Sequence, residues 1–148
     1  MDPICEKAVS LIKYYESLHD GDLHQVGLQP KPCPAGIWTG GYGRALRHPK
    51  TGKFLTLKGG NFDKIEANRQ CEGLTETIAE QWLAEDLAVF ATGVDAAIKV
   101  SVTPEQRGAL ISFAYNLGCI VLQIRTHRLE LPVSVSARWL AELLQCLG

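Results

Sequence analysis

The sequence predicts an α+β fold, with a small β lobe near the N-terminus packed beside a mainly helical lobe. Apolar residues recur at helical spacing before residue 18, and glycines alternate with β-prone residues between residues 33 and 57. Strong helix-start signals stand at Thr75 and Thr103. The 148 residues fit one domain, with a first helix at 3–18, a β-rich lobe at about 20–72 and a helical lobe at about 75–148.

The first predicted helix starts at Asp2 and Pro3, a capping side chain followed by a residue that needs no amide partner. Glu16 lies beside the apolar stripe of this helix, near its end. We expect partial burial to raise the pKa of Glu16, so that it holds a proton near neutral pH. The alternative is an ordinary solvated glutamate. The stripe consists of Ile4, Ala8, Leu11, Tyr15 and Leu18.

The β lobe is predicted from turn-forming residues. Residues 19–31 are rich in Gly, Asp and Pro and are expected to form a loop. Residues 33–44 (CPAGIWTGGYGR) indicate short strands joined by tight turns, and a second hairpin is expected around residues 48–53. Arg44 and His48 are expected on a solvated hairpin in preference to a substrate contact. Residues 62–73 give no clear pattern.

The helical lobe rests on two capped segments. Thr103, Pro104 and Gln106 form a capping box that starts a central helix, apolar on most sides, with Gly118 as its stop. Thr75 starts a longer helix before it. The expected buried face of that longer helix consists of Ile78, Trp82, Leu83, Leu87, Phe90 and Val94.

The formal net charge of −1 gives no argument for a nucleic-acid partner or for membrane insertion. The charges are nevertheless segregated: residues 31–69 carry eight basic and two acidic side chains, and residues 75–95 carry five acidic and no basic ones. This suits an anionic polymer such as cell-wall glycan, and two solvated faces are the alternative. No apolar run is long enough to span a membrane, and no secretory signal is expected.

Five cysteines, an odd number without CxxC spacing, predict neither a disulfide framework nor a zinc site. We therefore expect free thiols in a reducing compartment, and no metal or cofactor.

Four segments together resemble the phage-type lysozymes, the endolysins of glycoside hydrolase family 24. They are residues 11–16 (LIKYYE), residues 33–43, residues 75–87 and residues 102–118 (VTPEQRGALISFAYNLG), and the resemblance runs from about residue 8 to residue 118. Each piece is weak alone, but four in the right order and spacing are specific. The resemblance implies a lysozyme-like fold and hydrolysis of the β-1,4 bond between N-acetylmuramic acid and N-acetylglucosamine in bacterial peptidoglycan.

The resemblance also implies the roles of the site residues. Glu16 is expected to protonate the leaving oxygen as general acid, while Cys33 and Thr39 hold a water that attacks the opposite face, with inversion. Asp20 and Asp22, in a loop longer than compact members have, are alternatives to Cys33. A small buried hydrophobe at Cys33 and a plain strand residue at Thr39 are the alternatives to catalytic roles. The expected substrate-binding residues are Trp38, Gly40, Gly41, Tyr42 and Gly43, and for Tyr42 a role as a strand residue is equally open.

The C-terminal end departs from the family pattern. We find no family-like sequence after Gly118. Two hypotheses follow: a helical lobe that is incomplete after residue 118, and a shifted reading frame. Residues 137–147 favour a short amphipathic helix. Two other functions stay open: an inactive truncated or frameshifted remnant that only binds glycan or a partner, and a chitin-directed glycosidase.

The family implies a location and partners. The protein is expected in the host bacterial cytoplasm before release, acting on the periplasmic cell wall once a separate holin opens the inner membrane. A monomer is expected, with association through an uncovered apolar patch as the alternative.

Overall fold

The computed structural model describes residues 3–17, 27–98 and 101–117. The chain forms two compact units, divided after Tyr15 and after Asp86. The sheet unit is residues 16–86, and the helical unit comprises the described residues before and after it. Both divisions fall inside helices: α1 (Glu6–Ser17) and α3 (Glu76–Ala97). The first half of α3 therefore groups with the sheet, although the sequence places it in the helical lobe.

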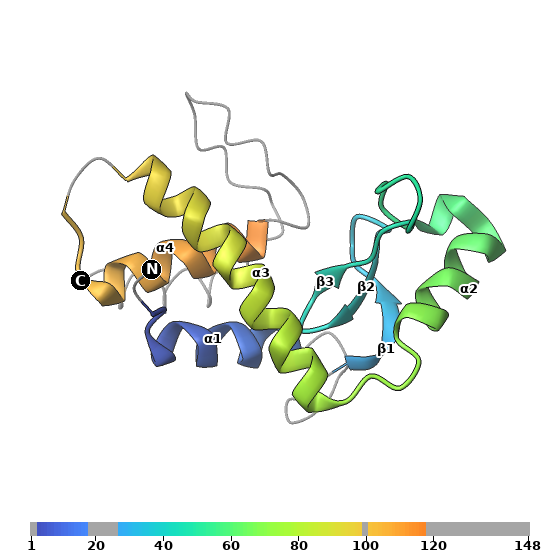
Figure 1. Ribbon diagram of the computed structural model, residues 1–148, viewed down its shortest axis with the longest axis horizontal. Coiled ribbons are helices and arrows are strands. Elements are labelled where there is room, and N and C mark those ends of the chain that lie inside the picture. Colours follow the sequence, from blue (N-terminus) through green and yellow to red (C-terminus); the bar gives the residue numbers. More distant parts are fainter. Residues whose placement is uncertain (1–2, 18–26, 99–100, 118–148) are drawn as a thin grey trace. The chain divides into compact units, whose positions relative to one another are not determined.

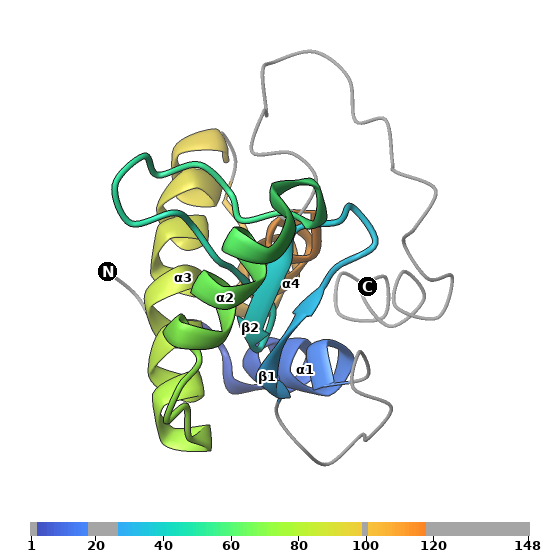
Figure 2. The ribbon, with the colours of Figure 1, turned by 90° about the vertical axis from the view of Figure 1, so that its right-hand side faces the viewer.

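The sheet unit contains three antiparallel strands in the order β1 (Gly27–Pro32), β2 (Trp38–Gly41) and β3 (Arg44–Ala45). A 3₁₀ turn, η2 (Leu57–Gly59), leads into α2 (Gly60–Gln70), which packs against β1 and β2 (Figures 1 and 2). The strands and the tight turn predicted from residues 37–44 are confirmed.

Strand β1 corrects the prediction of a loop over residues 19–31. Its two prolines, Pro30 and Pro32, argue against a strand in the middle of a sheet because they lack amide donors. The order of the strands places β1 at an edge, where a proline is tolerated, and Lys31 still pairs with Thr39 of β2.

The second hairpin is present as single bridges. Arg47 pairs with Phe54, and the Leu55 amide donates to the Leu46 carbonyl at 2.9 Å. The ambiguous stretch that follows becomes α2. This helix lacks an apolar stripe because it exposes Phe62 and Ile65 and buries Glu66 instead, which explains why its periodicity was weak.

In the helical unit, α1 begins at Glu6, three residues later than predicted. The Cys5 carbonyl accepts the Ala8 amide at 3.0 Å, so Cys5 stands at the start of the helix. A Cβ on Gly108 of α4 (Pro104–Leu117) would lie 2.6 Å from Cys5 Sγ and 3.0 Å from Ala8 Cβ. Helices α1 and α4 therefore pack closely together at Gly108, where a side chain would not fit without a shift (Figure 1).

The capping box of α4 is confirmed. The Gln106 amide donates to Thr103 Oγ1 at 3.2 Å, and the Thr103 amide donates to Gln106 Oε1 at 3.0 Å. Ile111 is fully buried, as a helix apolar on most sides requires. In α3 the Ile78 amide donates to Thr75 Oγ1, so Thr75 is the cap, but the Ile78 side chain is exposed; Ala79 is buried in its place.

Several expectations fall outside the described residues: the cap at Asp2, the alternatives Asp20 and Asp22, the stop at Gly118 and the helix at 137–147. Of the helices that the structure describes, none is both long and apolar enough to cross a membrane.

Candidate active site

Glu16 stands in the last turn of α1 and is partly buried. Burial raises the pKa of its carboxyl from 4.5 to about 7. The shift has the direction that the sequence predicts, and it leaves about half of the molecules with a protonated Glu16 at neutral pH. Such a group can give a proton to a leaving oxygen and take one back afterwards.

The turn between β2 and β3 lies directly against this carboxyl. Gly43 has a φ of +90°, and a Cβ built on it would lie 2.5 Å from Glu16 Oε2. A residue with a side chain is therefore disfavoured at this position by the backbone conformation, and it would also require the Glu16 carboxyl to move. Sequence reasoning expected Gly43 to leave room for substrate; its nearest neighbour is instead the candidate acid.

Thr39 lies on the less buried face of β2, opposite the face that carries Trp38 and Gly40. Its hydroxyl donates a hydrogen bond to the Lys31 carbonyl at 2.9 Å, across the β1–β2 pair. Because the proton of the hydroxyl is directed to Lys31, the oxygen presents its lone pairs as an acceptor. A water molecule that donates to this oxygen would be held in a defined orientation.

Cys33 occupies the turn that links β1 to β2. Its amide donates to the Ile37 carbonyl at 2.8 Å, and its carbonyl accepts the Gly36 amide at the same distance. The thiol is partly exposed and free, unlike that of Cys71, which is buried. A partly exposed cysteine at a strand end fits the alternative of a small buried hydrophobe less well than a fully buried one would.

The two aromatic residues of the motif lie in the interior. Trp38 is 8 % exposed and Tyr42 is 5 % exposed. Burial, with the nearby charges of Glu76 and Glu80, raises the pKa of Tyr42 to about 12. Little of either ring is open to a sugar, so the packing role that the sequence left open for Tyr42 fits the structure better.

Gly40 and Gly41 are glycines for packing reasons. A Cβ on Gly40 would lie 2.7 Å from Cys71 Sγ, and one on Gly41 would lie 3.3 Å from Ala79 Cβ. Both contacts are with side chains of the sheet unit itself, and a ring carbon of Trp82 lies within 3.6 Å of each. The space expected for a glycan at these two residues is filled by Ala79 and Trp82 of α3 and by Cys71, which precedes that helix.

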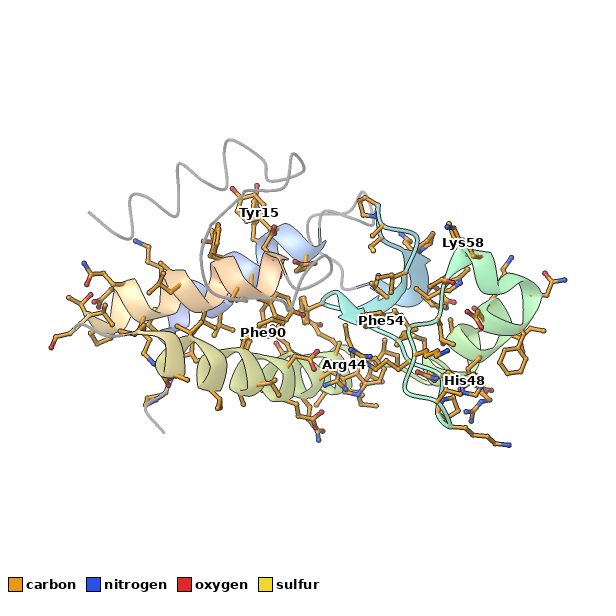
Figure 3. The ribbon with its side chains drawn as sticks, turned by 90° about the horizontal axis from the view of Figure 1, so that it is seen from above. Tyr15, Arg44, His48, Phe54, Lys58 and Phe90 are labelled. Carbon is orange, nitrogen blue, oxygen red and sulfur yellow. The ribbon has the colours of Figure 1, made fainter. Side chains whose placement is uncertain are left out.

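Arg44 is the residue whose role sequence reasoning missed. It was expected on a solvated hairpin, but its guanidinium binds Asp86, Glu85 and the Trp82 carbonyl of α3. Figure 3 shows Arg44 beside α3. The available signal was the segregation of charge, basic before residue 70 and acidic after residue 75. His48 instead stacks on Phe62, with 5.5 Å between ring centroids. Within residues 3–17, 27–98 and 101–117, no cluster of His, Cys, Asp and Glu is arranged to hold a metal ion.

The helices, the small antiparallel sheet and the acid that ends the first helix define a lysozyme-like fold. The structure resembles an endolysin from Escherichia coli O157:H7 phage FAHEc1, with a TM-score of 0.51, 27 % identity and coverage of 78 % of this chain and 58 % of that one. It also resembles the muramidase domain of SpmX from Asticaccaulis excentricus, with a TM-score of 0.50, 23 % identity and coverage of 80 % and 61 %.

The sequence model described as phage lysozyme matches residues 23–131. The chain therefore belongs to the phage lysozyme family. The match includes Cys33 and Thr39, begins after Glu16, and ends beyond Gly118, where the motifs were expected to stop. The expectation that no family-like sequence follows Gly118 is thus wrong for the residues up to 131.

Curated relatives include endolysins of Bacillus phage PZA, 40 % identical over 75 residues, and Bacillus phage B103, 36 % identical over 83 residues. These alignments cover 51 % and 56 % of this chain. The chain spans less than a third of the length of either relative, 28 % and 31 %. An endolysin of Acyrthosiphon pisum secondary endosymbiont phage 1 is 29 % identical over 130 residues, covering 88 % of this chain and 70 % of the relative.

Proposed function

We propose that the chain is an endolysin-type muramidase, which hydrolyses the β-1,4 bond between N-acetylmuramic acid and N-acetylglucosamine in peptidoglycan. The observation that carries the proposal is the carboxyl of Glu16, which is shielded by Gly43 and has a pKa of about 7. Membership of the phage lysozyme family supports the class of substrate.

In the proposed reaction, protonated Glu16 gives its proton to the glycosidic oxygen as the bond to the anomeric carbon breaks. A water held by the Thr39 oxygen, with Cys33 beside it at the end of the turn, attacks the anomeric carbon from the opposite face. The product sugar then carries the inverted configuration, because no covalent bond to the protein forms. The leaving sugar takes the proton of Glu16, and the water loses one to solvent, so the carboxyl must be reprotonated before the next cycle.

The proposal also includes the route by which the chain reaches the cell wall. The chain would reach the wall from the bacterial cytoplasm through a membrane opened by a separate holin, and its working partner would be the glycan strand alone.

The test is clearing of a purified peptidoglycan suspension by the wild type and by Glu16→Gln, with circular dichroism to compare their folding. Gln keeps the size of the side chain but cannot donate an acidic proton, so we expect a loss of about a hundredfold to ten-thousandfold. Equal clearing by the two proteins would remove Glu16 from the mechanism. A folded wild type that leaves peptidoglycan intact would favour the inactive remnant, and turnover of chitin oligomers alone would favour the chitin-directed enzyme.

A further inference from the structure

Arg44, the first residue of β3, joins the sheet to the first half of α3 through one guanidinium. Its Nε and Nη2 donate to the two carboxylate oxygens of Asp86 at 3.0 and 2.9 Å. Nη2 also donates to the Trp82 carbonyl and to Glu85 Oε2, both at 2.9 Å. The guanidinium carbon lies 4.8 Å from the centre of the Trp82 ring. A planar, bidentate group that is also stacked on a ring has little freedom to move.

The Arg44 contact is a charged and partly buried one. Side-chain exposure is 24 % for Arg44 and 26 % for Asp86. Burial alone would lower the pKa of Arg44, but hydrogen bonds to Asp86 and Glu85 outweigh burial and raise it. Arg44 therefore stays charged across the neutral pH range.

The residue next to Arg44 in the chain is Gly43, whose backbone lies against Glu16. Because Gly43 directly precedes Arg44, an anchored Arg44 limits how far the Gly43 backbone can move. Gly41, on the other side of the turn, has a φ of +59° and lies against Ala79 of the same helix. The turn is thus held on both sides by α3, and its middle screens the carboxyl.

We propose that Arg44 is a positioning residue for the reaction: its bridge to Asp86, Glu85 and the Trp82 carbonyl holds the β2–β3 turn so that Gly43 keeps water away from the Glu16 carboxyl. This inference rests on the proposed function, because it assigns Arg44 a part in preparing Glu16 as the acid. Arg44 itself acts through Gly43 and does not touch the glycan.

The direction in which the pKa of Glu16 changes when Arg44 is replaced distinguishes a positioning role from a simple effect of charge. Burial is the cause that raises the pKa of Glu16, so a turn that opens to water lowers this pKa toward 4.5. Removing a positive charge nearby would do the opposite, because a cation favours the ionised carboxylate. The charged groups on the elements around the turn include Lys13 on α1, Arg44 on β3, and Glu76, Glu80, Glu85 and Asp86 on the first half of α3.

The experiment measures clearing of purified peptidoglycan between pH 4 and pH 9 for the wild type, Arg44→Lys and Arg44→Gln. Lys keeps the charge but cannot reach two carboxylates and a carbonyl together. We expect both variants to lose about fivefold in rate at pH 7 and to move the alkaline limb down by about one pH unit. An upward shift for Arg44→Gln with no shift for Arg44→Lys would mean that only the charge matters, and would overturn the inference.

A matched control is Arg107→Gln. Arg107 makes an equivalent two-bond contact with Asp95, at 2.7 Å for each bond, within the helical unit. We expect this variant to keep the alkaline limb of the wild type, whatever it costs in stability. If Arg44→Lys and Arg44→Gln also keep that limb, Arg44 is only structural and the inference fails.

Two measures keep the test decisive. The pKa of Glu16 is also measured by ¹³C NMR in each variant, so the inference is tested even where clearing is slow. Arg44→Lys, which keeps the positive charge, decides the inference on its own if Arg44→Gln does not fold: a downward shift supports the inference, and no shift overturns it. A wild type without activity, or an active Glu16→Gln, would instead refute the proposed function.

Discussion

Gly43→Ala tests the contact between the β2–β3 turn and Glu16. The methyl group would lie 2.5 Å from Glu16 Oε2, where unstrained contacts begin near 3.4 Å, so the carboxyl or the turn must move by nearly 1 Å, about the difference between these distances. The φ of +90° adds the cost of a left-handed conformation for a residue with a Cβ, about 1–2 kcal/mol. Relief of the overlap adds at most about 1–3 kcal/mol, and less if the Glu16 carboxyl, the end of a flexible side chain, moves aside.

The chain offers a control that separates these two costs. Gly52, in the second hairpin, has a φ of +68°, and a Cβ built on it meets nothing within 4 Å. Gly52→Ala should therefore lose about 1–2 kcal/mol in free energy of unfolding from the backbone alone and keep full activity.

The assay combines urea unfolding with clearing of peptidoglycan by the folded proteins. We expect Gly43→Ala to lose more stability than Gly52→Ala and to lose about a hundredfold in clearing rate, because the acid is displaced from its position. The reasoning is refuted if the two variants have the same stability and the same activity.

Three further predictions concern stability. Gly40→Ala should cost about 1–3 kcal/mol in urea unfolding, since its Cβ would lie 2.7 Å from Cys71 Sγ, and in a Cys71→Ala background the cost should fall by about 1 kcal/mol or more; equal costs in both backgrounds would contradict this contact. Thr103→Ala should cost about 0.5–2 kcal/mol by removing the cap at Gln106, whereas an unchanged midpoint would show that the capping box contributes nothing. The raised pKa of Glu16 means that the native state binds the proton more tightly than the unfolded state, so its favourable contribution is present below pH 4.5 and is lost as the pH rises through about 7. The free energy of unfolding of Glu16→Gln should therefore equal that of the wild type at pH 4 and exceed it at pH 8. The excess should be at most about 3 kcal/mol, because the carboxyl is only partly shielded. An equal difference in this free energy at both pH values would contradict the raised pKa.

The sequence predicts well those parts of the fold whose structure is determined by residues close together in the chain. The capping box at Thr103 and the cap at Thr75 need only neighbouring residues, and both are confirmed. Strand β1 was missed because Pro30 argues against a strand unless it is known to lie at an edge. That knowledge depends on β2 and β3, which lie later in the chain.

Helix α2 was missed for the opposite reason. It buries Glu66, which is bonded to Arg69 at 2.7 Å, and it exposes Phe62 and Ile65. A periodicity argument assumes that apolar residues form the buried face, so it finds no helix here.

For the site, the raised pKa of Glu16 could be predicted from its place beside the stripe of α1. The partners of the glycines could not, because Gly40, Gly41 and Gly43 meet three different groups: Cys71, Ala79 and Glu16. A run of glycines indicates that other groups lie close to the backbone, but it does not indicate which residues those groups belong to.

The most direct measurement is the titration of Glu16 itself, alongside the pH dependence of peptidoglycan clearing. Protein labelled with ¹³C at the glutamate carboxyl is titrated by NMR, and the resonance absent from Glu16→Gln is assigned to Glu16. We predict a pKa of about 7, with the alkaline limb of clearing falling at the same pH. A pKa near 4.5 together with full clearing above pH 7 would contradict the account.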